Sequence, residues 1–134
     1  METRTADERT RAFSGAPWEG PIGYCRALRV GAQIFVTGTA PVTDEGAVHA
    51  PGDAYAQAVR CLDLIERALG TLGGELRHVV RTRMYVTDMG RWREVGRAHG
   101  ERFGAHPPCT TLVEVRALIE PEMLVEIEAD AVLD

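Results

Sequence analysis

Cysteine is scarce in this chain, and long hydrophobic runs are missing. Cys25, Cys61 and Cys109 are widely spaced, which argues against both a disulfide framework and a C-x-x-C zinc site, so we expect reduced thiols. No segment reaches the roughly 18 apolar residues of a membrane span. Residues 1–10 are polar and lack the apolar core of a signal peptide. We therefore expect a cytoplasmic protein with no membrane partner.

Runs of basic charge and the common catalytic motifs are also absent. A formal net charge of -5 without an arginine- or lysine-rich run argues against a nucleic-acid partner, because such binding needs a concentrated basic surface. The chain has no P-loop, H-E-x-x-H, G-x-S-x-G or Rossmann glycine motif. His49, His78, His99 and His106 lack metal-ligand spacing. We expect neither a metal nor a cofactor.

What is present is the composition of an ordinary globular protein. The 134 residues are 45% hydrophobic and 26% charged, enough for one hydrophobic core and too few for two domains. No repeat or linker divides the chain. We expect one domain over residues 1–134.

Strand-like runs lie towards both ends of the sequence. A hairpin is predicted around Gly31-Ala32-Gln33, and alternation at 79–87 places Met84 and Val86 opposite Arg81, Arg83 and Tyr85. The loop at 14–21 is dense in turn formers. The predicted strands are residues 10–13, 24–30, 34–37, 79–87, 110–115 and 123–132.

Two helices are predicted between these strands. Asp53 stands at an N-cap position and Gly73-Gly74 supplies a stop. Asp88 is predicted to cap a second helix at about residues 90–103. The apolar positions that recur every three or four residues are Tyr55, Ala58, Val59, Leu62, Ile65, Leu69 and Leu72 in the first helix and Trp92, Val95, His99 and Phe103 in the second. The element order predicts an α+β two-layer domain with both helices on one sheet face.

The final strand carries two carboxylates that need an explanation. Its alternation turns Glu126 and Glu128 away from the core-facing residues Met123, Val125, Ile127 and Ala129. A solvated strand face, or edge charges that prevent aggregation, would explain the pair. A functional site is the alternative.

His106 and Cys109 offer a second candidate site, with a base and a nucleophile. Both flank a Pro-Pro turn, and nothing in the sequence fixes the distance between them.

Ordered segments along nearly the whole chain resemble the Rid family, also called YjgF or L-PSP. The closing V-E-I-E-A strand is the most specific of them. The matching segments are S-G-A-P-W-E (14–19), G-Y-C-R-A (23–27), F-V-T-G-T (35–39), D-A-Y-A-Q (53–57), V-V-R-T-R-M-Y-V-T-D (79–88), P-C-T-T-L-V-E-V (108–115) and L-V-E-I-E-A (124–129).

The resemblance implies a chorismate-mutase-like fold, with a mixed β-sheet carrying two helices on one face. It also implies a homotrimer with a small-molecule cleft at each subunit interface. In the deaminating members, water hydrolyses a 2-imino or 2-enamino acid there to a 2-keto acid and ammonia, without a cofactor. Glu126 aligns with the glutamate that positions water, Tyr24 with the cleft tyrosine, and Thr37-Gly38 with the serine-glycine pair of the pocket.

One position departs from the family pattern. The arginine that binds the substrate carboxylate falls on Thr110, which offers one neutral donor in place of a charged bidentate fork. Losing a charge-assisted hydrogen bond costs about 1.5–3 kcal/mol, so simple 2-imino acids should bind poorly. Arg83 on the polar strand face, or Arg26, offers a substitute cation, whereas Arg116 is better explained as a surface charge.

Three functions follow from the resemblance. The first is an enzyme of a divergent subgroup, related to aminomuconate-deaminase-like proteins, that hydrolyses an enamine or imine to a carbonyl compound and ammonia. The second is a non-catalytic trimer that binds a small molecule or regulates a protein, which the missing arginine favours. The third, an endoribonuclease or translation inhibitor, is disfavoured by the acidic charge and the lack of stacking aromatics.

Overall fold

The computed structural model describes residues 1–134 and contains one seven-stranded mixed sheet. The strand order is β1-β2-β3-β4-β7-β5-β6, with β5 and β6 parallel and every other pair antiparallel. The strands are β1 (Glu2–Ala6), β2 (Arg9–Phe13), β3 (Ala27–Val30), β4 (Gln33–Thr39), β5 (Val79–Val86), β6 (Cys109–Glu114) and β7 (Val125–Val132).

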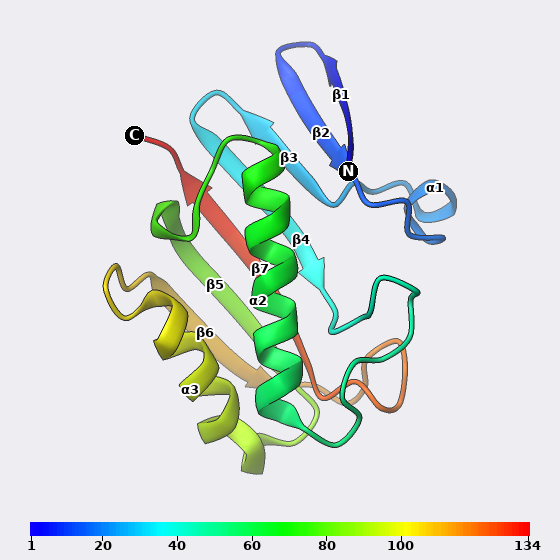
Figure 1. The fold of residues 1–134 in the computed structure, drawn as a ribbon, viewed down its shortest axis with the longest axis vertical. Helices are drawn as coiled ribbons and strands as arrows, with labels where there is room; N and C mark the ends of the chain where they lie inside the picture. The colour runs from blue at the N-terminus through cyan, green and yellow to red at the C-terminus, as the bar shows by residue number, and fades with distance from the viewer.

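The two long helices, α2 (Ala54–Thr71) and α3 (Trp92–Phe103), lie side by side on one face of this sheet (Figure 1). The predicted two-layer α+β arrangement is thereby confirmed. Three shorter pieces complete the chain: α1 (Glu19–Ile22) and the 3-10 turns η1 (Leu76–His78) and η2 (Met89–Arg91). No helix is both long enough and apolar enough to cross a membrane.

Helix α2 begins and ends where the sequence predicts. The Asp53 carboxylate accepts a hydrogen bond from the Ala56 N–H at 2.9 Å, which satisfies one of the free donors of the first turn. At the other end Gly73 takes a left-handed φ of 88°, a conformation that glycine adopts without a steric penalty. Both ends of the helix therefore have a local cause.

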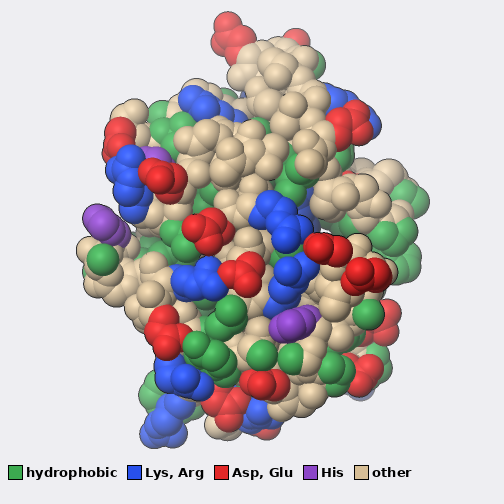
Figure 2. All heavy atoms as spheres, viewed as in Figure 1, with side chains coloured by type: hydrophobic (Ala, Val, Ile, Leu, Met, Phe, Trp, Pro, Cys, Tyr) green, Lys and Arg blue, Asp and Glu red, His purple; other side chains and the backbone are tan.

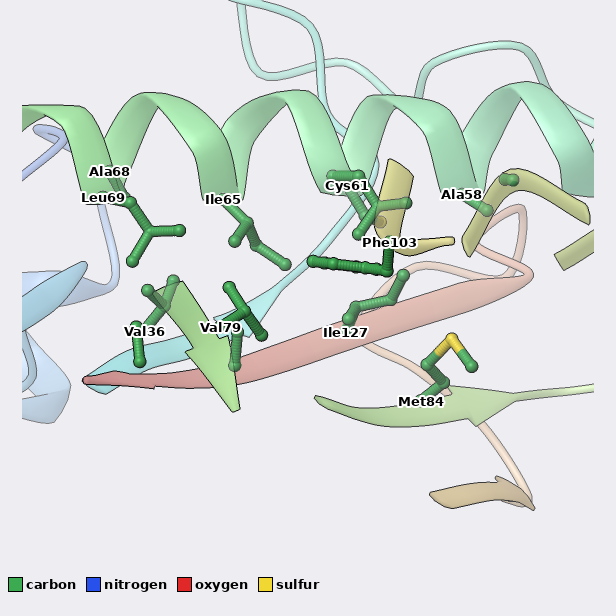
Figure 3. Close-up of a cluster of buried hydrophobic side chains, with 14 of the residues drawn as sticks. Val36, Ala58, Cys61, Ile65, Ala68, Leu69, Val79, Met84, Phe103 and Ile127 are labelled. Atoms are coloured by element: carbon green, nitrogen blue, oxygen red, sulfur yellow. The ribbon is translucent and has the colours of Figure 1, made fainter. Parts of the chain in front are cut away.

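The core lies between α2 and the sheet. Ile65 and Leu69 of α2 are fully buried and point onto the strands, where Ile127 is also fully buried (Figure 3). Leu62 of α2 and Ile34 of β4 are fully buried in the same core. Along β7 every second residue from Val125 is buried, so the predicted alternation is confirmed. Glu126 and Glu128 consequently belong to the face of the sheet away from the helices, which we call the open face.

The two faces of the molecule differ in their side chains. On the helix side, acidic and arginine side chains are interspersed over α2 and α3 (Figure 2). On the open face, by contrast, three large hydrophobic side chains remain 41–43% exposed, namely Phe35, Val113 and Val132. Large apolar side chains exposed on the same face of a sheet are a feature of surfaces that another molecule covers.

Several sequence-based boundaries were wrong. Strand β1 was not predicted because its five residues are all exposed and gain their order from pairing with β2. The strand predicted at 24–30 begins only at Ala27, since the Tyr24 N–H bonds to the Glu19 carbonyl instead. Asp88 caps the turn η2 rather than α3, and Trp92 at the start of α3 is 45% exposed rather than part of the apolar stripe.

Candidate functional site

The candidate site begins at an irregularity between β4 and β7. The two strands pair regularly as far as Val36, and the register shifts before Thr39, leaving Thr37 and Gly38 in a bulge. The carboxylate of Glu126 lies against this bulge, because a Cβ added to Gly38 would come within 2.8 Å of Glu126 Oε2. Residue 38 must therefore be glycine because the Glu126 carboxylate approaches its backbone closely, and not because its backbone conformation demands glycine.

Glu126 is the acidic residue of the open face that has no partner. It makes neither a hydrogen bond nor an ion pair within the chain, whereas Glu128 accepts from the Tyr85 hydroxyl at 2.6 Å and Asp130 from Arg83 at 3.3 Å. Burial raises the pKa of Glu126 above its usual value, the Arg26 cation lowers it, and Glu128 raises it further. A half-buried carboxylate with a raised pKa and free oxygens suits acid-base chemistry.

Arg26 is the cation whose charge acts on this carboxylate. Its Nη2 donates to the Gly38 carbonyl at 2.9 Å, and its guanidinium carbon lies 5.9 Å from the centre of the Tyr24 ring. Burial lowers the pKa of Arg26, and its Nε is the one buried side-chain polar atom without a hydrogen-bond partner. The sequence-predicted residues Tyr24, Gly38 and Glu126 therefore meet around Arg26.

Beside this cluster the open face is hollowed into a depression of about 530 Å³. Tyr24 and Thr37 line it, together with the apolar Phe13, Leu28 and Phe35. Glu126 does not line the depression, although its carboxylate contacts Gly38, the residue next to Thr37. The predicted pocket residues Tyr24 and Thr37 thus share a concave surface that adjoins the carboxylate.

Glu19 is a residue of this region that the sequence analysis missed. Its buried carboxylate accepts from the Ser14 hydroxyl and N–H and from the Gly15 N–H, and its carbonyl accepts from the Tyr24 N–H at 3.1 Å. Glu19 therefore joins the predicted loop at 14–21 to Tyr24. A glutamate among the turn formers of this loop was the signal in the sequence.

The two other arginines considered as substitute cations are either paired or outside the sheet. Arg83 is on the open face, but its Nη1 lies 3.3 Å from Asp130 and 3.8 Å from Glu128. Arg116 is exposed in the segment after β6. His106 and Cys109 are both exposed, and no hydrogen bond joins them. Of the cations considered, only Arg26 accompanies Glu126.

Thr110 lies on the opposite face of the sheet from Glu126. It is opposite Thr82 in the β5–β6 ladder, and the Thr82 hydroxyl donates to Thr110 Oγ1 at 2.7 Å. Thr82 is buried under α3, whereas Glu126 is opposite Tyr85, whose side chain is on the open face. One copy of the chain therefore cannot bring Thr110 and Glu126 to a single small ligand.

The fold has counterparts among known proteins. A family model described as Endoribonuclease L-PSP matches residues 19–133, and the chain belongs to this family, the YjgF or Rid family of the sequence resemblance. A crystal structure of a Mycobacterium tuberculosis member of the YjgF/YER057c/UK114 family is 49% identical, has a TM-score of 0.85, and covers 93% of this chain and 99% of that one. The expected chorismate-mutase-like fold is thus confirmed.

Two further relatives are similar to this chain over more than four fifths of its length. A RutC family protein of Pyrococcus abyssi is 34% identical over 112 residues, or 83% of this chain and 87% of the relative. The 3-aminoacrylate deaminase RutC of Acinetobacter baylyi is 28% identical over 108 residues, or 81% of this chain and 85% of the relative. The chain is therefore similar over most of its length to a protein named for the deamination of an enamine.

Proposed function

We propose that this protein hydrolyses an enamine or imine to a carbonyl compound and ammonia, with Glu126 as the catalytic residue. The observation that carries the proposal is the free, half-buried Glu126 carboxylate held against the Gly38 backbone. The similarity to a 3-aminoacrylate deaminase supports the reaction class. Tyr24, Thr37 and Gly38 supply the surrounding wall of the site.

The chemistry needs one carboxylate and no electron transfer. The enamine first becomes an imine, as its carbon gains a proton and its nitrogen loses one. Glu126 accepts a proton from water as the water oxygen attacks the imine carbon, and it returns the proton to nitrogen. The hydroxyl proton of the carbinolamine then passes to nitrogen as the C–N bond breaks, which releases ammonia and leaves the carbonyl group. The raised pKa of Glu126 lies closer to neutral pH than that of an ordinary glutamate. Glu126 is therefore suited both to accept the proton from water and to return it to nitrogen.

We further propose that the site is completed between copies of the chain in a homotrimer, the assembly expected from the family resemblance. Phe35, Val113 and Val132 on the open face are the apolar side chains that a neighbouring copy would cover. In such an assembly Thr110 of one copy can face Glu126 of another, which a single chain does not allow.

A second function has its own supporting observation. Thr110 stands where deaminating relatives are expected to hold the substrate carboxylate with arginine, and Arg83 is engaged with Asp130. A trimer that keeps the cleft but binds a small molecule without converting it would have the same features. Cleavage of RNA gains no comparable support, because the net charge is -5 and the arginines of the helix side are interspersed with acids (Figure 2).

The test is the release of ammonia from 2-aminoacrylate generated in place by a pyridoxal-phosphate dehydratase. We expect the wild type to accelerate hydrolysis and Glu126→Gln to lower the rate by at least about 100-fold. Glu66→Gln, which removes an exposed carboxylate on the outer side of α2, is the matched control and should behave as wild type. Binding of 2-aminoacrylate without acceleration by the wild type would instead support the second function.

A further inference from the structure

A chain of hydrogen bonds connects the interior of the protein to Thr110. His99 on α3 is 9% exposed, and its Nε2 lies 2.8 Å from the hydroxyl of the fully buried Thr82. Thr82 in turn donates to Thr110 Oγ1 at 2.7 Å. Thr110 itself is exposed on the edge strand β6 (Figure 1). The chain therefore begins in the core and ends at the surface.

The direction of the donors follows from counting protons. The Thr82 hydroxyl has one proton, and it points at Thr110. The His99 Nε2 atom must then be protonated and donate to Thr82, because two acceptors facing each other would leave the contact unpaired. The Thr110 proton remains free for a ligand. Donors aligned in this way polarise one another, which strengthens the last bond of the chain.

Every member of the chain is uncharged. Burial lowers the pKa of His99 and so keeps the imidazole neutral, while Phe103 packs against the ring at 4.6 Å. Arg81, the cation one residue before Thr82, belongs to the opposite face because the strand alternates. An acceptor at Thr110 would consequently meet a strong neutral donor, and neither His99 nor Arg81 of the same chain would place a positive charge beside it. A carboxylate bound to the Thr110 hydroxyl would lose hydration there without gaining an ion pair from this chain of hydrogen bonds.

We propose that His99, acting through Thr82, makes the Thr110 hydroxyl a specificity-determining donor that selects ligands with an uncharged carbonyl oxygen at this end of the site. The substrate class is then an enamine or imine that carries an amide, ketone or ester carbonyl in place of the free carboxylate of a 2-imino acid. This inference rests on the proposed function in one respect, since it places Thr110 in the ligand cleft. His99 and Thr82 are positioning residues that do not touch the ligand.

The test compares two stable probes of the same shape, pyruvate and its uncharged amide, pyruvamide. Dissociation constants are measured by NMR titration of the full-length protein. We expect the wild type to bind pyruvamide about tenfold more tightly than pyruvate. Thr110→Val and Thr82→Val, which remove a hydroxyl at nearly constant shape, should each lower pyruvamide affinity several-fold. Thr110→Ser, which keeps the hydroxyl, should retain the affinity for pyruvamide.

The role of His99 is separated from a purely structural one by two further variants. His99→Leu should weaken pyruvamide binding, whereas His99→Gln, whose side-chain amide can still donate to Thr82, should restore much of the affinity. In a double-mutant cycle, His99→Leu should have no further effect once Thr110→Val is present. Thermal unfolding of each variant identifies any loss that comes from misfolding.

The outcomes distinguish this inference from the proposed function. A wild type that binds pyruvate as tightly as pyruvamide, or that binds neither, overturns the inference, as does a His99→Leu effect that persists unchanged with Thr110→Val. Glu126→Gln should abolish hydrolysis and leave the preference for pyruvamide intact. A clear preference for pyruvamide in a protein that hydrolyses no enamine would contradict the proposed function alone.

Discussion

The carboxylate of Glu126 lies against the backbone of Gly38, in the bulge where β4 and β7 lose their regular register. A methyl group on residue 38 would come within 2.8 Å of Glu126 Oε2. This contact fixes where the carboxylate can be, so the identity of residue 38 controls the geometry of the proposed reaction.

Gly38→Ala is therefore expected to reduce hydrolysis more than it reduces stability. The new methyl group displaces the end of a flexible side chain, and a displacement of about 1 Å at a reacting group can cost roughly 100-fold in rate. We expect a fall of that order in kcat for 2-aminoacrylate, with little change in the melting temperature. Gly20→Ala is a suitable control, because a Cβ at that position meets no atom within 4 Å. Wild-type kcat in Gly38→Ala would contradict the assigned geometry.

Arg26→Met should move the pH dependence of the reaction. The Arg26 cation holds the pKa of Glu126 down against the effect of burial, so its removal raises that pKa further. Because the carboxylate must be ionised to accept a proton from water, the acidic limb of the kcat/KM profile should shift to higher pH. Arg83→Met, which removes a cation paired with Asp130, provides the comparison. An unmoved acidic limb would show that Arg26 does not act on the catalytic group.

Glu126→Gln should make the folded protein more stable at neutral pH while removing activity. The folded-state pKa of Glu126 is raised above its ordinary value, so the folded state binds this proton more tightly than the unfolded state does. The free energy of unfolding consequently falls as pH rises through the window between the unfolded and the folded pKa. Melting curves at several pH values should give a higher Tm for Glu126→Gln at pH 7 and no gain below the ordinary glutamate pKa. A lower Tm at pH 7 would mean that the carboxylate has a stabilising partner.

Thr110→Arg should change which ligands bind. An arginine at this position adds a charge-assisted hydrogen bond worth about 1.5–3 kcal/mol, or roughly 10- to 100-fold in affinity for a carboxylate. We expect KM for 2-aminoacrylate to fall by that factor, because Thr110 is exposed and the longer side chain has room. Thr3→Arg, on the exposed strand β1 at the opposite edge of the sheet from β6, should have no such effect. Equal behaviour of the two variants would remove position 110 from the ligand site.

Much of the fold was predictable because its signals are local. The apolar spacing of α2, the Asp53 cap and the alternation of β7 each depend on residues close in sequence. Strand β1 was missed for the opposite reason. Its residues are exposed, and their order comes from hydrogen bonds to β2 rather than from a hydrophobic pattern.

The site was predictable in its residue types but not in its arrangement. Alternation along β7 was enough to turn Glu126 away from the core. The sequence could not show that Arg26, and not Arg83, accompanies Glu126. Arg83 is paired with Asp130, and this ion pair joins β5 to β7, which are far apart in the sequence. The His99–Thr82–Thr110 chain joins three elements and has no signature in the sequence.

The proposed reaction site uses Glu126 of one copy and Thr110 of another. This arrangement is tested by co-expressing two inactive variants, Glu126→Gln and Thr110→Asp, and measuring hydrolysis by the mixed trimers. With random mixing, about a quarter of the intersubunit sites would combine an intact Glu126 with an intact Thr110. We predict that about a quarter of the wild-type rate returns in the mixture, while each variant alone stays inactive. A mixture as inactive as its components would contradict the claim, because it would mean that both residues act within one chain or not at one site.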